Sequence, residues 1–283
     1  MGVVNVTPDS FSDGGAWLEP AAAVAHGLQL AADGADIIDV GGESTRPGAQ
    51  RVDEQEELRR IGPVVAELAA ADLVVSVDTM RAAVAEFAIG AGARLVNDVS
   101  GGQADPRLPR VVASAGVPYV IAHWRGFSRD MYGQAAYDDV VREVRDELAA
   151  RVDAVTEAGV DPAAVVVDPG IGFAKLSGHN WALLSRLDEI SRLGGRTFPV
   201  LIGASRKSFL GRLLADPQGE PRAAEERDAA TVAVSTLAAA SGAWCVRVHA
   251  VAANADAVRV AARWRDARGR QTAGLPESAG RAG

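Results

Sequence analysis

Residues 1–15 read MGVVNVTPDSFSDGG, and this stretch contains the unit from which the rest of the chain is built. A short apolar run, Gly2-Val3-Val4, leads into Asn5, and a run of this length is typical of a buried parallel strand. Pro8 and the Gly14-Gly15 pair then predict a loop, which carries carboxylate and hydroxyl groups around one aromatic residue, Phe11. Composition alone does not decide between an ordinary surface loop and part of a binding site.

The same unit, an apolar run that ends in polar or glycine residues, recurs along the chain. The strand-like runs are eight in number and cover 2–6, 36–40, 74–77, 94–96, 119–122, 165–167, 200–202 and 244–248. Ala- and Leu-rich stretches with helical spacing lie between them, among them 20–32, 53–70, 138–158 and 227–240. Strands that alternate with helices predict βαβ units and a parallel sheet.

Eight such units favour a closed (β/α)8 barrel over an open, doubly wound sheet. An open sheet normally carries a phosphate-binding G-x-G-x-x-G after its first strand. Here the first strand ends in Asn5, and the run Gly170-Ile171-Gly172 lacks the third glycine. The length of 283 residues suits one barrel, which typically needs roughly 250. We therefore expect a single α/β domain, a TIM barrel over residues 1–266, with a flexible tail over 267–283.

Charge and composition bear on the class of partner. The net charge is −8 and the chain has no basic block, so a nucleic-acid partner is not expected. No stretch reaches the roughly 18 uninterrupted apolar residues of a membrane span, and no signal-peptide pattern is visible, so no membrane partner is expected. Cys245 is the only cysteine, which excludes an intrachain disulfide and indicates a reducing compartment. We expect a cytoplasmic protein.

Polar side chains stand at the end of every predicted strand. In a parallel barrel the carboxyl ends of the strands converge on one face, where the active sites of this architecture lie. A single strand-end Asp often caps a helix or pairs with an Arg, but eight polar strand ends out of eight favour a binding site. The residues concerned are Asn5, Asp39, Asp78, Asn97, Asp98, His123, Asp168, Lys207, Arg247 and His249.

One half of this set suits a flat ring. Asp78, Asn97 and Asp168 match the edge of a heterocycle such as a 2-amino-4-oxo pyrimidine, because a carboxylate can accept two parallel N–H bonds from such an edge. Lys207 can donate to a ring oxygen or nitrogen, and Arg247 can lie flat against the ring.

The other half suits an anion. Lys207 and Ser208 open a predicted helix, whose first amides favour a carboxylate or a phosphate. Arg247 and His249 neighbour Asn5, because a barrel closes its eighth strand onto its first. Asn5 could contribute a carbonyl oxygen to Mg²⁺, which usually binds substrate phosphates through few protein ligands.

Taken together, these motifs resemble the dihydropteroate synthase family and follow its order from Met1 to about Arg265. The matching stretches begin at Asn5 (NVTPDSFSDGG), Gly41 (GGESTRPG), Ser76 (SVDT), Val96 (VNDVSGG), Asp168 (DPGIGF), Ser205 (SRK) and Arg247 (RVH). The resemblance implies a TIM-barrel transferase that joins 6-hydroxymethyl-7,8-dihydropterin pyrophosphate to 4-aminobenzoate, giving 7,8-dihydropteroate and pyrophosphate in folate synthesis. It also implies Mg²⁺ as cofactor, a homodimer, and competitive inhibition by sulfonamides.

The resemblance further implies a role for each site residue. The pterin is held by Asp78, Asn97, Asp168 and Lys207, with Arg247 stacked on it. The pyrophosphate and Mg²⁺ are held by Asn5, Arg247 and His249, of which Asn5 is the metal ligand. The 4-aminobenzoate pocket is bordered by Phe173, Lys207 and Ser208, and the loop residues that close over the site are Phe11, Asp13, Thr45, Arg46 and Pro47. The implied catalytic residues are Asp13, Thr45, Arg46, Lys207, Arg247 and His249.

Two stretches depart from the family pattern. Ala250 follows the Arg-Val-His triplet where the family often has Asp, which puts in doubt the support that this Asp would give His249. The fifth strand end reads His123-Trp124-Arg125-Gly126 in place of the commoner His-Met-x-Gly. A pterin-binding methyltransferase barrel and a catalytically silent pterin-binding paralogue stay open as alternatives. An assay of pyrophosphate release from the two substrates with Mg²⁺ separates all three.

Overall fold

A computed structural model of the chain describes residues 1–7, 19–43, 51–126 and 134–272, with side chains up to residue 267. Six strands form one parallel sheet in sequence order: β1 (Gly2–Asn5), β2 (Ile38–Gly41), β3 (Val75–Asp78), β4 (Leu95–Asp98), β5 (Tyr119–Ala122) and β6 (Val165–Asp168). Two shorter strands, β9 (Leu201–Ile202) and β10 (Cys245–Val246), pair with each other in parallel.

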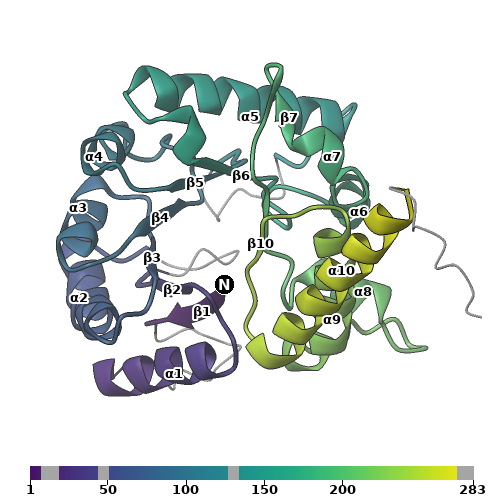
Figure 1. Ribbon diagram of the computed structural model, residues 1–283, viewed down its shortest axis with the longest axis horizontal. Helices are drawn as coiled ribbons and strands as arrows, with labels where there is room; N and C mark the ends of the chain where they lie inside the picture. Colours follow the sequence, from purple (N-terminus) through teal and green to yellow (C-terminus); the bar gives the residue numbers. More distant parts are fainter. Residues whose placement is uncertain (8–18, 44–50, 127–133, 273–283) are drawn as a thin grey trace, which may run out of the picture.

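Two isolated parallel bridges close these strands into a ring. Val167 at the end of β6 pairs with Val200 before β9, and Gly2 in β1 pairs with Val248 after β10. The ring therefore has eight positions, and helices surround it on the outside (Figure 1). The predicted (β/α)8 barrel is confirmed.

The helices follow the predicted order. They are α1 (Pro20–Ala32), α2 (Glu54–Ala70), α3 (Ala82–Gly90), α4 (Leu108–Ala115), α5 (Val140–Glu157), α6 (Ser177–Leu184), α7 (Leu187–Ile190), α8 (Ser208–Leu213), α9 (Asp228–Ala240) and α10 (Val251–Thr272). Single turns of 3₁₀ helix cover Pro162–Ala164 and Ala224–Arg227, and β7 (Arg192–Leu193) and β8 (Arg196–Thr197) form a small antiparallel hairpin. Asp53 caps α2 by accepting from the Glu56 amide at 2.7 Å, as expected of an Asp at this position.

Strand alternation decides which side chains point into the barrel. Leu95, Val120, Val166 and Leu201 form a buried apolar cluster with Met1, separate from the larger core that packs between strands and helices. Side chains two positions apart on a strand point the same way, so residues 97 and 168 share a face with Leu95 and Val166. The barrel interior is therefore apolar at the amino ends of the strands and polar at their carboxyl ends.

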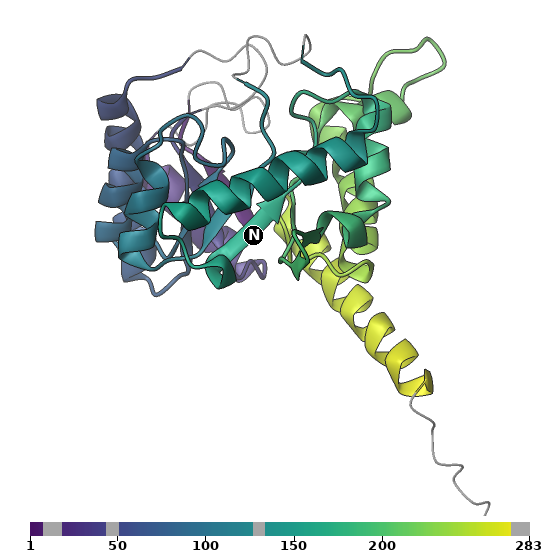
Figure 2. The same ribbon diagram turned by 90° about the horizontal axis from the view of Figure 1, so that it is seen from above.

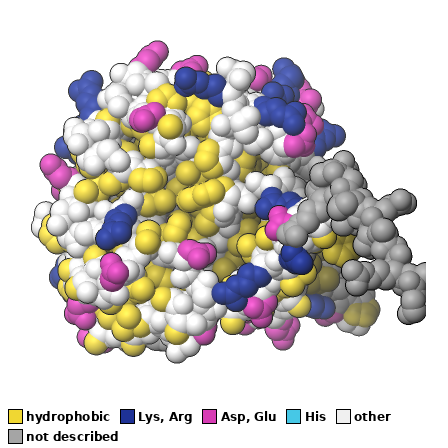
Figure 3. Space-filling view, in the orientation of Figure 1, with side chains coloured by type: hydrophobic (Ala, Val, Ile, Leu, Met, Phe, Trp, Pro, Cys, Tyr) yellow, Lys and Arg dark blue, Asp and Glu magenta, His cyan; other side chains and the backbone are white. Residues whose placement is uncertain are grey.

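Figure 3 shows the face of the molecule that is also seen in Figure 1, and hydrophobic side chains gather in its centre. Met1 lies at this end of the barrel, where its ammonium group donates to the carbonyl of Val246 at 3.0 Å. At the amino ends of the strands the barrel interior is thus filled by apolar side chains.

The carboxyl-terminal segment differs from the expected tail. Helix α10 extends beyond the barrel (Figure 2) and continues to Thr272, so residues 267–272 have helical backbone, while residues 273–283 lie outside the described part. The frayed end was expected from a polar composition rich in Gly, Arg and Ala, of which Ala and Arg have high helix propensity, and residues 267–272 continue the helix. No helix in the described ranges combines the length and the hydropathy that crossing a membrane requires.

Candidate active site

A partly buried cation lies between two carboxylates at the polar end of the barrel. Arg247 follows β10 and donates through Nε to Asp39 Oδ2 at 2.5 Å and through Nη2 to Asp78 Oδ2 at 2.7 Å. Asn97 on β4 donates to the same oxygen of Asp39 at 3.0 Å. The side chain of Asp39 is fully buried and Asp78 is only 9% exposed. Strands β2, β3, β4 and β10 thus contribute to one cluster.

Burial and charge act against each other in this cluster. Burial raises the pKa of Asp78 to about 7; the Arg247 cation opposes the rise, and the nearby carboxylate of Asp39 adds to it. Burial also disfavours the charged guanidinium, but the carboxylates of Asp39 and Asp78 outweigh it and raise the pKa of Arg247. The cluster therefore holds a permanent cation next to an acid that titrates near neutral pH.

A second pair of opposite charges lies at the ends of β6 and β9. Asp168 accepts from the Gly170 amide at 2.7 Å, and Lys207 donates through Nζ to the Ile171 carbonyl. A methyl group added at Gly203 would lie 3.8 Å from Lys207 Nζ and 3.9 Å from Asp168 Oδ2, so this glycine leaves room between the two charges. Burial lowers the pKa of Lys207 to about 8, against the effect of the Asp168 carboxylate.

Phe173 lies next to this pair. Its ring is half-buried, and Lys207 Nζ stands 4.6 Å from the ring centroid in a cation–π contact. Ser208 is exposed at the first position of α8, directly after Lys207. The residues expected to border the 4-aminobenzoate pocket therefore lie together beside Asp168.

His249 is held by the neighbouring strand end. Its backbone amide and its ring Nδ1 lie 3.2 and 3.0 Å from the hydroxyl oxygen of Ser205. The support that was in doubt because Ala250 replaces the family's Asp is thus supplied here by Ser205. Asn5 ends β1, which the Gly2–Val248 bridge joins to the segment before His249, so the two residues occupy neighbouring strand ends.

The structure accordingly brings most predicted site residues to one end of the barrel. They are Asn5, Asp78, Asn97, Asp168, Phe173, Lys207, Ser208, Arg247 and His249. Phe11, Asp13, Thr45, Arg46 and Pro47 lie outside the described residues. Arg247, which the resemblance stacks on the pterin ring, is here bound at its edge by two carboxylates.

Two buried residues at this end had no predicted role. Asp39 was noted only as a strand end, although its position two residues before Gly41 already places it on the inner face of β2. Lys175 lies in the Gly-rich segment after β6 and is 3% exposed. Its only sequence signal is a lysine inside an otherwise apolar stretch.

A charged network supports the base of the segment that follows β2. Glu57 on α2 is almost fully buried and accepts from the Thr79 hydroxyl at 2.6 Å and from Arg81. Arg81 also donates to Glu43 at 2.7 Å, and Arg51 donates to the other oxygen of Glu43 at 3.0 Å. These bonds fix both ends of the segment whose middle carries the predicted Thr-Arg-Pro loop.

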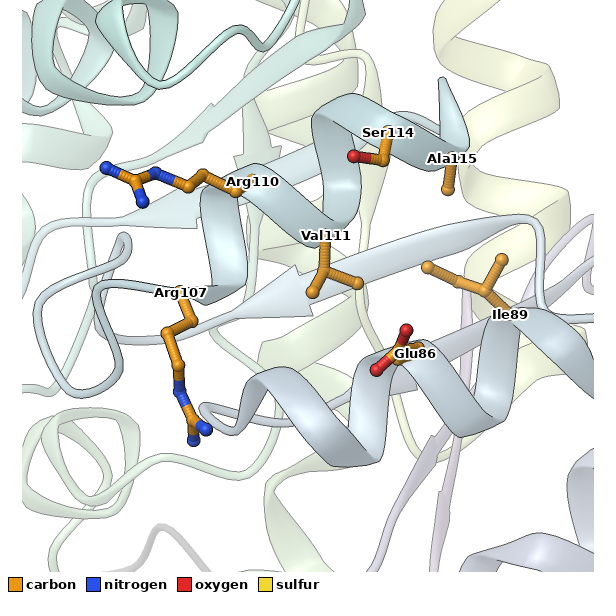
Figure 4. A pocket seen from close by; sticks show the side chains of 7 residues that line it. All are labelled: Glu86, Ile89, Arg107, Arg110, Val111, Ser114 and Ala115. Carbon is orange, nitrogen blue, oxygen red and sulfur yellow. The ribbon is translucent and has the colours of Figure 1, made fainter.

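A recess elsewhere on the molecule has a different character. A hollow of about 450 Å³ lies on the outer face between α3 and α4. Figure 4 shows the residues that line it: Glu86, Ile89, Arg107, Arg110, Val111, Ser114 and Ala115. Arg107 is already paired with Asp105 at 2.9 Å, and no strand end reaches this recess.

The residues described contain no group of three or more His, Cys, Asp or Glu side chains placed to hold a metal ion.

Comparisons with known proteins agree with this geometry. The model of the family described as "Pterin binding enzyme" matches residues 1–249. The dihydropteroate synthase of Mycobacterium leprae is 56% identical over 265 residues, which cover 93% of this chain and 92% of the relative. The structure of Yersinia pestis dihydropteroate synthase with a sulfonamide drug complex has a TM-score of 0.87 and 38% identity and covers 94% of both chains.

A further structure, Xanthomonas albilineans dihydropteroate synthase in complex with 7,8-dihydropteroate, has a TM-score of 0.81 and 42% identity. It covers 98% of this chain and 94% of its own. The identity and the mutual coverage are high, and the described polar residues of the family motifs lie at one end of the barrel. The chain therefore belongs to the pterin-binding enzyme family and, within it, to the dihydropteroate synthases, transferases that attach a pterin-methyl group to 4-aminobenzoate in folate biosynthesis.

Proposed function

We propose that the buried acids at the carboxyl end of the barrel hold the pterin ring of 6-hydroxymethyl-7,8-dihydropterin pyrophosphate. Asp168, Asp78 and Asn97 accept from or donate to the 2-amino-4-oxo edge, and Lys207 donates to a ring acceptor. The observation that carries this proposal is that these side chains lie on strand ends facing one interior, within a protein that buries nearly all of Asp78 and Asn97. Buried carboxylates bind paired N–H donors strongly because water does not compete for them.

Arg247 combines two contacts with the substrate in this proposal. Its Nε donates to Asp39 and its Nη2 donates to Asp78, both in the plane of the guanidinium. Nη1 has no hydrogen-bond partner among the described residues. The faces of the guanidinium then stack on the pterin ring, while Nη1 donates to the pyrophosphate.

The pyrophosphate lies over Arg247, His249 and Asn5. Asn5 is half-buried and ends a strand, so its amide oxygen suits Mg²⁺, which needs few protein oxygens when substrate phosphates and water fill the other positions. When bound, the ion would neutralise charge on the departing pyrophosphate.

The proposed reaction begins with loss of pyrophosphate. The bond between the methylene carbon and the pyrophosphate oxygen breaks, and the electron pair leaves with the oxygen. Arg247 and His249 stabilise the leaving anion, and the carboxylates of Asp78 and Asp168 stabilise the positive charge that spreads over the pterin ring. The amine of 4-aminobenzoate, held between Phe173, Lys207 and Ser208, then attacks the carbon and loses a proton.

An assay of pyrophosphate release with both substrates and Mg²⁺ tests the pterin assignment. Asp168→Asn and Lys207→Ala should each lower kcat/KM by at least about a hundredfold, because each removes a charge that faces the ring. Asp98→Asn is the matched control: Asp98 is buried next to Asn97 but points outward, where it accepts from Ser100 and Tyr119. Its kcat/KM should stay within about threefold of wild type. Turnover near wild type for Asp168→Asn contradicts the assignment.

The loop residues outside the described part have a separate test. Asp13→Ala and Arg46→Ala should lower turnover more than affinity for the pterin pyrophosphate if these loops close during reaction. The opposite order contradicts their role in closure.

We also propose that the chain acts as a cytoplasmic homodimer. The outer faces of α9 and α10 expose Leu237, Val260 and Trp264 at 67%, 63% and 65%, and the two helices lie side by side (Figure 1). Exposed apolar clusters of this kind support an interface between subunits. Light scattering should give twice the chain mass for wild type and the single chain mass for Trp264→Glu.

The lone cysteine, Cys245, supports the reducing compartment.

A further inference from the structure

Lys175 is a buried lysine that the mechanism above does not use. It lies between β6 and α6 and is 3% exposed, and a lysine is seldom buried this far without partners. Its Nζ donates to the carbonyl of Phe173 at 3.0 Å and lies 2.9 Å from Nδ1 of His123. Lys175 therefore links the end of β5 to the main chain of the residue that borders the arylamine pocket.

The partners of His123 determine which of its ring nitrogens donates and which accepts. The carboxylate of Glu147 can only accept, so Nε2 of the neutral His123 ring carries the proton and Nδ1 accepts from Lys175. Nε2 lies 2.8 Å from Glu147 on α5, and Glu147 also accepts from Arg125. Burial and the Lys175 cation lower the pKa of His123 to about 4, which agrees with a neutral ring. A continuous chain of hydrogen bonds thus runs from α5 to Lys175.

A second contact reaches the next residue of the same turn. The guanidinium of Arg125 lies 3.9 Å from the centroid of the Tyr137 ring, and the Tyr137 hydroxyl donates to the carbonyl of Ala174 at 3.1 Å. Ala174 has a φ of +46°, which is unfavourable for a residue with a side chain. Two successive carbonyls are therefore each held by a side chain: that of Phe173 by Lys175 of the same turn, and that of Ala174 by Tyr137 from outside it.

These contacts affect Phe173 because its ring and its main chain are each held by a lysine. Lys207 lies over the ring, and Lys175 binds the carbonyl. Without the bond from Lys175, the Phe173 carbonyl loses its side-chain donor, while the neighbouring groups of the turn keep theirs: Ile171 from Lys207, Gly172 to Asn180 and Ala174 from Tyr137. The ring of Phe173 would then lose its fixed place under Lys207.

We propose that Lys175 is a positioning residue for the arylamine substrate. It holds the Phe173 main chain so that the ring forms one wall of the 4-aminobenzoate pocket, and Tyr137 shares this task through Ala174. The inference rests on the proposed function, in which Phe173 and Lys207 border that pocket. It gives the β5–α5 segment, where this chain reads His-Trp-Arg, a part in recognition of the second substrate.

Steady-state kinetics with each substrate varied in turn test this proposal. Lys175→Met keeps the apolar stem and removes the donor, and it should raise the KM for 4-aminobenzoate about tenfold. The KM for the pterin pyrophosphate and kcat should each stay within about threefold. Tyr137→Phe should raise the same KM about threefold. If Lys175→Met does not fold, Tyr137→Phe decides: an unchanged KM for 4-aminobenzoate then overturns the proposal.

Tyr119→Phe is the matched control. It also removes a tyrosine hydroxyl that donates to a residue at the end of an element, since the buried Tyr119 donates to Asp98, the last residue of β4, at 2.7 Å. This variant should lower the melting temperature and leave the KM for 4-aminobenzoate unchanged. A rise in that KM as large as the Tyr137→Phe rise means that any loss of a loop contact has the same effect, and the proposal fails.

Phe173→Ala separates the inference from the function on which it rests. If Phe173→Ala leaves the KM for 4-aminobenzoate unchanged, the proposed pocket itself is wrong. If it raises that KM but Lys175→Met does not, the pocket stands and the role of Lys175 is wrong. In the Phe173→Ala background, Lys175→Met should add less than about twofold, because its effect acts through the missing ring.

Discussion

Replacing Asp78 by Asn should remove a pH dependence of stability that the wild-type barrel shows between pH 5 and pH 8. Asp78 is 9% exposed, and burial, with Asp39 nearby and against the effect of Arg247, raises its pKa to about 7. In the unfolded chain the same carboxyl returns to an ordinary value near 3.8. Asn at this position keeps the shape and one acceptor for Arg247 but has no proton to lose.

The sign and the size follow from the two pKa values. Between pH 4 and pH 7 the folded chain keeps a proton that the unfolded chain has released, so raising the pH favours unfolding. Each pKa unit corresponds to about 1.4 kcal/mol. From pH 5 to pH 7 the free energy of unfolding of wild type should therefore fall by roughly 2 to 3 kcal/mol through this group alone, and it should level off above pH 7.

Urea denaturation of wild type and Asp78→Asn at pH 5, 6, 7 and 8 measures this effect. The other titrating groups are common to both proteins, so the difference in unfolding free energy should move by about 2 to 3 kcal/mol in favour of the variant as the pH rises. Asp105→Asn serves as control: the Arg107 contact lowers the pKa of Asp105 to about 2, so its difference from wild type should be flat over this range. A flat difference for Asp78→Asn as well would refute the reasoning.

Three further outcomes are expected. Asp39→Asn should lower the free energy of unfolding by about 2 to 3 kcal/mol in urea titrations, because it removes a fully buried carboxylate and leaves the partly buried Arg247 guanidinium with one carboxylate partner. Gly170→Ala should destabilise by more than about 3 kcal/mol, since the added carbon would lie 2.2 Å from the His123 carbonyl, whereas Gly116→Ala, at nearly the same φ but with open space, should cost only about 1 kcal/mol. Removal of Mg²⁺ with a chelator should lower turnover more than tenfold and leave the affinity for a pterin without phosphates unchanged by calorimetry.

The order of the elements was predictable because apolar runs, and the polar or glycine residues that end them, act locally. The helix predicted over 20–32 agrees with α1, and Asp53 caps α2 where the prediction began it. The last two strands are shorter than predicted, since only Leu201–Ile202 and Cys245–Val246 keep a regular ladder. Single bridges close the barrel there, and the apolar pattern of a sequence cannot distinguish a bridge from a strand.

The site was predictable as a set of strand ends but not as a set of pairs. The sequence places Asp78, Asp168 and Lys207 at the ends of strands, and parallel topology then brings them to one face. The pairing of Arg247 with Asp39 could not be predicted, because the two residues lie 208 positions apart and meet only when the barrel closes. The role of Lys175 was not predicted for a similar reason: its partner His123 belongs to a different strand end, and neither residue is part of a periodic apolar pattern.

The same burial that hides these pairs also prepares the site for its substrate. Burial is the largest effect on the pKa of Asp78, Asp168 and Lys207, and in each case it disfavours the charged form. The acids and the cations are therefore held where each lacks part of the solvation that water would give. In the proposed complex, a pterin edge would return N–H donors to the acids and an acceptor to Lys207, and a pyrophosphate would return negative charge to Arg247. Binding energy at this site thus comes from groups that folding leaves incompletely satisfied, and a site made of the same residues at the protein surface would bind the pterin more weakly.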